Sequence, residues 1–362
     1  MPYYKLKKNL IEREDISLTI KCPESSHEYR FQFNNQLELR ERQLMNKLLS
    51  SQNKIERVCS NSHEITKLLT ELSQVCRNIQ GITVRIKQEV KHKSNPDKDV
   101  DEIMDESKSL VKIVMTQKHL RTFDFSCYRE PNLLPNLILN GLSGEKLELF
   151  EEWHTQRNCV LIMEALEAHA HSLEVLSFDG LNSLHWKELA NLQKFNKLRE
   201  LNFSNLSYRW NLSPLKLLYT SDLPNLQKLS FRNSQIYAHG ILKIIETNSQ
   251  HLTSLDLRIE RKYWVPSYNI DKDYHLFFKH VGRVCPKLLH FSCFITFVKD
   301  LESILDLVKS CTKLQTLIID KHDSWKARNC DLDAIDNFLS SITSLKSKNL
   351  NTFCFVIIPM EN

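Results

Sequence analysis

The chain has 362 residues, a length typical of two domains or of one elongated array of repeats. Hydrophobic residues make up 41% of it and charged residues 26%, a composition that excludes an intrinsically disordered chain. The formal net charge of +5 is small for this length, so we expect no nucleic-acid partner of the kind that a polybasic surface attracts.

The amino-terminal sequence predicts neither secretion nor membrane insertion. Its basic stretch, MPYYKLKKNLIERED, is not followed by the apolar core of about 7–15 residues that a secretory signal needs. No window of the chain approaches the roughly 18–20 apolar residues of a membrane-spanning helix. We therefore expect an intracellular protein, cytoplasmic or nuclear, with no membrane partner and with its ten cysteines as free thiols.

The first fifty residues differ from the rest of the chain. ISLTIK (16–21) and EYRFQF (28–33) have the alternation of two short strands, with a proline-containing turn between them. Residues 37–50 have the pattern of an amphipathic helix. The remainder, 51–362, carries a repeat. Because the end of a repeat array must be covered, we predict that 1–50 forms its N-terminal cap.

A short apolar pattern recurs from residue 79 onward. It places an aliphatic residue first, an apolar residue three positions later and another two positions after that. Seven matches start at 173, 198, 226, 252, 288, 314 and 350, at spacings of 25, 28, 26, 36, 26 and 36 residues. A period of about 20–29 residues with this core is the signature of leucine-rich repeats. The nine matches are Ile79-Ile82-Val84, Leu120-Phe123-Phe125, Leu173-Leu176-Phe178, Leu198-Leu201-Phe203, Leu226-Leu229-Phe231, Leu252-Leu255-Leu257, Leu288-Phe291-Cys293, Leu314-Leu317-Ile319 and Leu350-Phe353-Phe355.

Each repeat predicts a short strand followed by a helix. The last two apolar residues of the pattern are two apart, so they face the same side of a strand. Residues 236–248 and 300–311 carry apolar residues at helical spacing. Neither element buries its apolar face alone, but stacked copies do. We therefore predict an α/β fold: a curved leucine-rich-repeat solenoid of about ten irregular repeats, with parallel strands on its concave face and helices on its convex face.

Three cysteines share one position relative to the repeat. Cys76, Cys285 and Cys311 each lie three residues before a repeat start, where the preceding helix ends. Because no CxxC pair accompanies them, we interpret them as small apolar residues packed at the corner between helix and strand. His169 and His171 are two apart, whereas zinc-binding histidine pairs are usually three to five apart. We expect these histidines at an exposed, polar helix end.

No motif in the sequence predicts catalysis. Three aspartates within 97–101 have the opening spacing of a calcium loop, but Glu102 occupies the position that requires glycine. Neither a G-x-S-x-G nor an H-E-x-x-H motif is present. We expect no catalytic residue, metal or cofactor, and keep an enzyme that uses Asp256 and His290 as a weaker alternative.

The side chains that flank the two core positions of each strand are predicted to face the concave surface. They are mostly small and polar in the centre and charged toward the edges. Such a surface suits contact with another protein or an extended peptide. The candidate protein-binding residues are Asp179, Glu200, Asn202, Lys228, Ser230, Arg232, Asp256, Arg258, His290 and Asp320.

The insertion at 259–271 follows a predicted strand directly, so it should project from one edge of the array. It contains Tyr263, Trp264 and Tyr268 among charged residues. Exposed aromatic residues beside charges resemble interface hot spots, which makes these three candidate loop contacts. The alternative is that they fold back over the sheet edge.

Two stretches of the sequence resemble a known family. CPKLLHFSCF (285–294) and the succession from LPNLQKLSF (223–231) to ILKIIETNSQHLTSLDL (241–257) resemble the ribonuclease-inhibitor-like repeats of F-box/leucine-rich-repeat proteins. They are most similar to the large fungal families expanded in arbuscular mycorrhizal fungi, over roughly residues 45–355. The resemblance implies that the concave residues hold a substrate of a ubiquitin ligase (an SCF complex), with the ligase adaptor and cullin as further partners.

One part of the family pattern is not found. An F-box opens with a Leu-Pro dipeptide that leads into an apolar helix, and residues 1–50 contain no such run. The predicted function is therefore a non-catalytic protein-interaction module that resembles the substrate-recognition repeats of a ubiquitin-ligase receptor. The alternative is a freestanding leucine-rich-repeat scaffold or inhibitor with no link to ubiquitin ligases.

Overall fold

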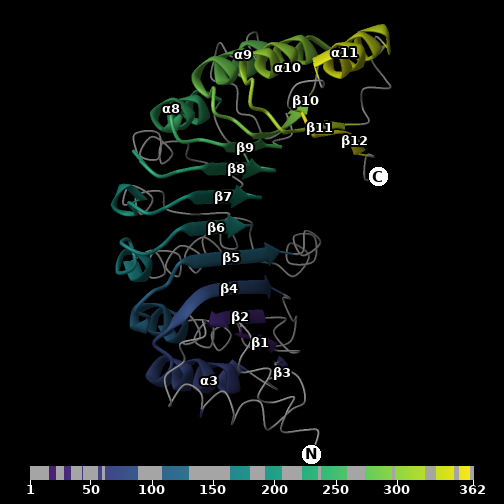
Figure 1. Cartoon of the computed structure of the whole chain (residues 1–362). Helices are drawn as coiled ribbons and strands as arrows, with labels where there is room; N and C mark the ends of the chain where they lie inside the picture. Colours follow the sequence, from purple (N-terminus) through teal and green to yellow (C-terminus); the bar gives the residue numbers. More distant parts are fainter. Residues whose placement is uncertain are drawn as a thin grey trace, which may run out of the picture. The chain divides into compact units, whose positions relative to one another are not determined.

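Strands alternate with helices along the chain and pair mostly in parallel, which confirms the predicted α/β class (Figure 1). The chain divides into two compact units, Met1–Lys197 and Leu198–Asn362. The computed structural model describes residues 16–21, 28–33, 43, 56–58, 62–88, 108–129, 164–179, 192–205, 222–234, 238–258, 274–295, 298–322, 332–345 and 350–358.

The first unit combines an antiparallel and a parallel part. Its strands lie in the order β3-β1-β2-β4-β5-β6. Strand β2 is antiparallel to β1 and to β4, whereas β4, β5 and β6 run parallel. The strands predicted over 16–21 and 28–33 are confirmed with the same bounds; the helix predicted over 37–50 lies, apart from residue 43, outside the described residues. The elements are β1 Ile16–Lys21, β2 Glu28–Phe33, β3 Glu56–Val58, α3 Ser62–Val75, β4 Ile79–Gln88, β5 Thr122–Arg129 and β6 Val175–Asp179.

The second unit has strands β7 to β12, which pair in parallel from one neighbour to the next. Its helices α8 to α11 lie on one face of these strands (Figure 1). The helices predicted over 236–248 and 300–311 are confirmed as α8 and α10. The elements are β7 Glu200–Ser204, β8 Lys228–Arg232, α8 Ala238–Asn248, β9 Ser254–Leu257, α9 Tyr274–Val284, β10 His290–Ile295, α10 Val298–Ser310, β11 Thr316–His322, α11 Leu332–Leu345 and β12 Thr352–Ile358.

The repeated apolar residues form the core between strands and helices. Leu229 and Phe231 of β8 are 0–1% exposed, because alternate side chains of a strand point to the same face. The rings of Phe203 and Phe231, which hold the same place in neighbouring repeats, stack with their centroids 5.3 Å apart. Phe278 of α9 meets Phe291 of β10 edge to face at 5.9 Å. The sequence pattern therefore correctly identifies the buried face of the strands.

Two consecutive strands, β7 and β8, are each followed by an asparagine with the same backbone conformation. Asn205 and Asn233 adopt positive φ values of 53° and 46°, a conformation that asparagine tolerates better than most residues. Their backbone N–H groups donate to the carbonyls of Arg232 (2.9 Å) and Arg258 (3.1 Å), respectively. The same turn thus links each strand end to the next repeat.

Polar side chains at the helix ends bind each repeat to the one before it. Gln117 accepts a hydrogen bond from the N–H of Ile79 (2.9 Å) and donates to the carbonyl of Cys76 (3.0 Å). Asn248 accepts one from the N–H of Leu223 (3.0 Å). These bonds satisfy buried backbone groups at the two corners.

The three cysteines that lie three residues before a repeat start, Cys76, Cys285 and Cys311, are buried, as predicted. Burial, the main cause, raises the pKa of Cys285 to about 12 and that of Cys311 to about 11. The thiol of Cys311 points to the carbonyl of Cys285, with a sulfur-to-oxygen distance of 3.4 Å. Such protonated thiols pack as small apolar groups and have little nucleophilic character.

The expectation for His169 is wrong, whereas His171 is exposed as predicted. The side chain of His169 is buried because it packs at the end of its helix against the backbone of the preceding repeat. Burial lowers its pKa and keeps the ring neutral, and its Nε2 lies 2.6 Å from the carbonyl of Val114. A neutral ring that donates from Nε2 satisfies this carbonyl of the preceding repeat.

Candidate functional site

The strands of the second unit present one face to the helices and one away from them. We call the latter the open face. Along it, Ser230 of β8 lies in register with Asp256 of β9, and Asp256 with Ser292 of β10. Nine of the ten candidate binding residues belong to this unit: Glu200, Asn202, Lys228, Ser230, Arg232, Asp256, Arg258, His290 and Asp320.

The centre of the open face is recessed. Ser230, Asp256 and Ser292 are each less than a tenth exposed, although they point away from the helices. Neighbouring strands lie about 4.8 Å apart, so short side chains between longer ones have little contact with solvent. The sequence predicts small polar side chains at these central strand positions, but it does not predict how strongly the neighbouring side chains cover them.

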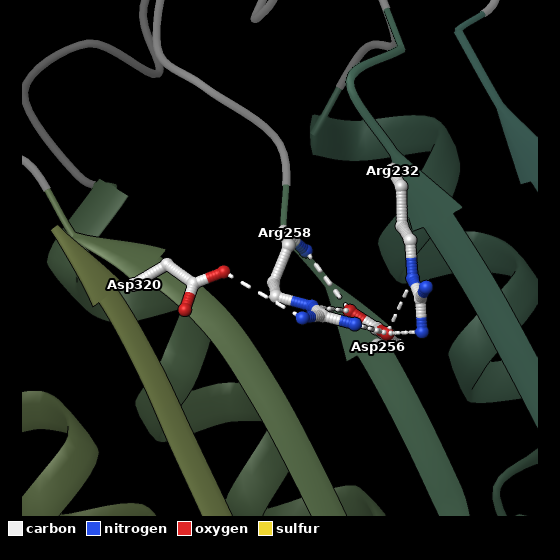
Figure 2. A network of polar contacts seen from close by, with 4 residues as sticks. All are labelled: Arg232, Asp256, Arg258 and Asp320. Carbon is white, nitrogen blue, oxygen red and sulfur yellow. Dashed lines mark hydrogen bonds and ion pairs between the residues drawn. The ribbon is translucent and has the colours of Figure 1, made fainter. Parts of the chain in front are cut away.

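Asp256 joins two arginines at the middle of the open face (Figure 2). Its carboxylate accepts from Nε and Nη2 of Arg258 at 2.9 and 2.8 Å, and from Nε of Arg232 at 2.7 Å. The side chain of Asp256 is only 12% exposed, whereas that of Arg232 is 50% exposed. Charge-assisted hydrogen bonds of this kind are stronger than neutral ones, so they fix both guanidinium groups in place.

Asp320 extends the network to β11. Nη1 of Arg258 lies 3.7 Å from the carboxylate of Asp320, so Arg258 stands between two acids (Figure 2). Burial raises the pKa of Asp320; Arg258 opposes this rise and Asp256 adds to it. The hydrogen bond from Arg258 to Asp256 is the main cause that raises the pKa of Arg258, which keeps the guanidinium charged.

Exposed charges flank the recessed centre. Lys228 of β8 pairs with Glu200 of β7 at 2.5 Å, and about half of the lysine side chain faces solvent. His290 at the start of β10 is exposed, and Asn202 of β7 lies in register with Ser230. The candidate residues of the second unit thus gather on one face, with a charged, buried centre and more exposed charges around it.

Asp179 is the one candidate binding residue that belongs to the first unit. It ends β6 in register with Ser126, near Asp124 of β5. Burial is the main cause that raises the pKa of Asp124; Arg85 lowers it and Asp179 raises it further. Asp124 holds the same position in its repeat as Asp256, and Arg85 holds the same position as Arg258. Neither Asp124 nor Arg85 was among the candidate binding residues.

The two residues of the enzyme alternative lie on neighbouring strands, two positions out of register with each other. In the β9–β10 register, His290 lies opposite Ser254, and Asp256 lies opposite Ser292. The carboxylate of Asp256 is occupied by two guanidinium groups. A carboxylate that orients a catalytic histidine accepts a hydrogen bond from the ring N–H, whereas the hydrogen bonds described for Asp256 come from arginine.

Three candidate contacts lie outside the described residues: Tyr263, Trp264 and Tyr268. Within the described ranges, no group of three or more His, Cys, Asp or Glu side chains has an arrangement that could hold a metal ion. Of the helices in those ranges, none combines the length and the apolar character needed to cross a bilayer.

No protein-family model matches the chain, and no curated protein matches its sequence.

Proposed function

We propose that the chain is a non-catalytic protein-recognition module, built as a curved leucine-rich-repeat solenoid with the open face on its concave side. The parallel register of β7 to β12, the helices on one face and the shared turn at Asn205 and Asn233 support the solenoid. The antiparallel β1 and β2, next to β4, support a cap formed by residues 1–50.

The observation that carries the binding proposal is the network of Arg232, Asp256, Arg258 and Asp320. Its arginines are held in one conformation before any partner arrives, so binding costs little side-chain entropy. Arginine is also enriched among residues that dominate binding energy at protein interfaces. Arg232 combines a fixed position with a half-exposed side chain and is the residue we expect to contact a partner most directly.

The partner class rests on the resemblance to F-box/leucine-rich-repeat proteins. We propose that the open face holds a substrate of a ubiquitin ligase, inside the cell, and that the ligase adaptor and cullin bind elsewhere on the chain. A freestanding scaffold or inhibitor is the alternative, and it uses the same face because that surface does not depend on a link to the ligase.

Affinity purification of the tagged chain, followed by mass spectrometry, tests both forms of the proposal. We compare the wild-type chain with the open-face variant Lys228→Ala/Arg232→Ala, in which Arg258 still holds Asp256. The helix-side variant Lys243→Ala/Lys313→Ala removes the same charge from exposed positions and is the matched control.

Recovery of an adaptor and a cullin with all three chains, together with proteins that only the open-face variant loses, supports the ligase form. Loss of specific proteins from the open-face variant, with no adaptor or cullin in any sample, supports the scaffold form. If the open-face variant retains every protein that the wild-type chain recovers, the proposed binding face is wrong.

A further inference from the structure

Helices α8, α9 and α10 leave a groove on the side of the second unit opposite the open face. Its volume is about 750 Å³, and it is partly open to solvent. It lies between helices whose buried faces already pack on the sheet, so it is additional to the core and to the open face.

The floor of this groove is apolar. Leu242 of α8 and Leu276 and Phe277 of α9 line it. Leu276 is 47% exposed, one of two large apolar side chains that stand out in this way among the described residues. When a partner covers this exposed leucine and removes it from water, the complex is stabilised by roughly 25 cal/mol for each Å² of apolar surface buried.

The rim of the groove is cationic. Lys279 and Arg283 lie one helical turn apart on α9, and Lys309 of α10 also lines the groove. Asp306 is the one carboxylate among the lining residues, and its oxygen lies 3.5 Å from Nζ of Lys279. The side chain of Lys279 is 65% exposed, so this ion pair is weak in water. Three cations therefore face one anion across the groove.

A histidine fixes one of these cations. Nη2 of Arg283 lies 2.8 Å from Nδ1 of His280, and Nε2 of His280 lies 2.7 Å from Oε1 of Glu246. A guanidinium group only donates, so Nδ1 must accept and the ring proton sits on Nε2, where it donates to Glu246. Glu246 does not line the groove. The chain Glu246–His280–Arg283 thus positions the guanidinium group at the rim without adding an anion to the lining.

We propose that this groove binds an acidic segment of a partner protein that carries at least one large apolar side chain. The carboxylates would pair with Lys279, Arg283 and Lys309, while the apolar side chain would cover Leu276. Amphipathic helices bind grooves between helices in this mode. A nucleic acid or a free phosphate would use the cations but would leave the apolar floor in water, which makes the acidic peptide the better match.

Selection from a random peptide library displayed on phage, against the full-length chain, tests this site. We expect enriched peptides to combine Asp or Glu with Leu, Phe or Ile. Fluorescence anisotropy of a labelled peptide with the enriched consensus should show binding that weakens about tenfold or more in Lys279→Glu/Arg283→Glu. The Leu276→Ser variant should also weaken it, without a change in charge.

Two controls separate this site from the open face. The Lys243→Glu/Lys313→Glu variant reverses two exposed charges that do not line the groove, and Lys228→Ala/Arg232→Ala alters the open face. Both should bind the consensus peptide as the wild-type chain does, so this result stands whether or not the open face has a partner.

Three outcomes would overturn the proposal. The first is that no peptide is enriched; the second is that the enriched peptides lack an excess of acidic residues or bind the groove variant unchanged. The third is a concentration-dependent increase in size by light scattering that the groove variant abolishes, because a second copy of the chain would then occupy the groove.

Discussion

Arg258 and Asp256, two residues apart at the end of β9, form a bidentate ion pair in which two guanidinium nitrogens contact the carboxylate at 2.8 and 2.9 Å. Arg258 directly follows β9, and residues two apart in an extended backbone point to the same face, so the sequence spacing itself brings the pair together. Because Asp256 also accepts from Arg232, one carboxylate organises the polar centre of the open face.

Replacement of Asp256 by asparagine should leave the shape of the site but remove the charge that holds both arginines. Hydrogen bonds to charged groups contribute about 1.5–3 kcal/mol, and asparagine keeps part of this. We expect Asp256→Asn to lower the free energy of unfolding by about 1–2 kcal/mol in urea titrations followed by circular dichroism. Glu302→Gln, at an exposed position of α10, is the control, and an equal loss in both variants would contradict this role.

Gln117 should be among the most sensitive polar residues of the first unit. Its amide satisfies the N–H of Ile79 and the carbonyl of Cys76, both at a buried corner. Gln117→Ala removes both of these hydrogen bonds at a buried corner, so we expect a loss of about 2–4 kcal/mol in the free energy of unfolding. The exposed Gln193→Ala should stay within about 0.5 kcal/mol of the wild-type chain. Equal unfolding midpoints for the two variants would argue against the role of Gln117.

Much of the fold could be predicted from the sequence, because the apolar period of the repeat reflects local geometry. The bounds of β1 and β2 and the buried positions Leu229 and Phe231 follow from alternation alone. The burial of His169 did not follow, because it depends on the backbone carbonyl that the preceding repeat presents at the corner.

The candidate site was predictable only in part. The positions of Arg232, Asp256 and Arg258 within the repeat predict that they share one face. The degree of burial of Asp256, however, depends on the length of its neighbours' side chains. The groove on the helix side did not follow from the sequence, because the repeat pattern identifies strand faces and not the spaces between helices. Lys279 and Arg283, four residues apart beside the exposed Leu276, are the signal that could have revealed it.

The buried cysteines should resist alkylation. Burial raises the pKa of Cys285 to about 12 and of Cys311 to about 11, so both are protonated at pH 8 and closed to reagents. Cys354 is exposed on β12. In native conditions we expect iodoacetamide to modify Cys285 and Cys311 at least about a hundredfold more slowly than Cys354, as measured by mass spectrometry of peptides. Equal rates in the native chain, with faster labelling of all three in urea, would contradict the structure.

Asp320 should make stability depend on pH. Burial raises its pKa above the ordinary value of 3.8. An acid whose pKa is higher in the folded state binds its proton more tightly there than in the unfolded state. Its contribution to the free energy of unfolding is therefore complete below pH 3.8 and is lost as the pH rises through the folded-state pKa. We therefore expect Asp320→Asn to raise the free energy of unfolding at about pH 7, and expect this gain to disappear near pH 3.5. Asp336→Asn, at an exposed position of α11, is the control. A variant that is less stable than the wild-type chain at pH 7 would show that the contact with Arg258 outweighs burial.

The central claim is that the open face of the second unit binds a partner protein, and a binding titration tests it most directly. A partner that co-purifies with the wild-type chain is titrated by calorimetry against three chains: wild type, Lys228→Ala/Arg232→Ala and Lys243→Ala/Lys313→Ala. We predict that the open-face variant binds at least about tenfold more weakly, while the helix-side control binds within about twofold of the wild-type chain. Equal affinities of the wild-type chain and the open-face variant, with unchanged circular dichroism, would contradict the claim.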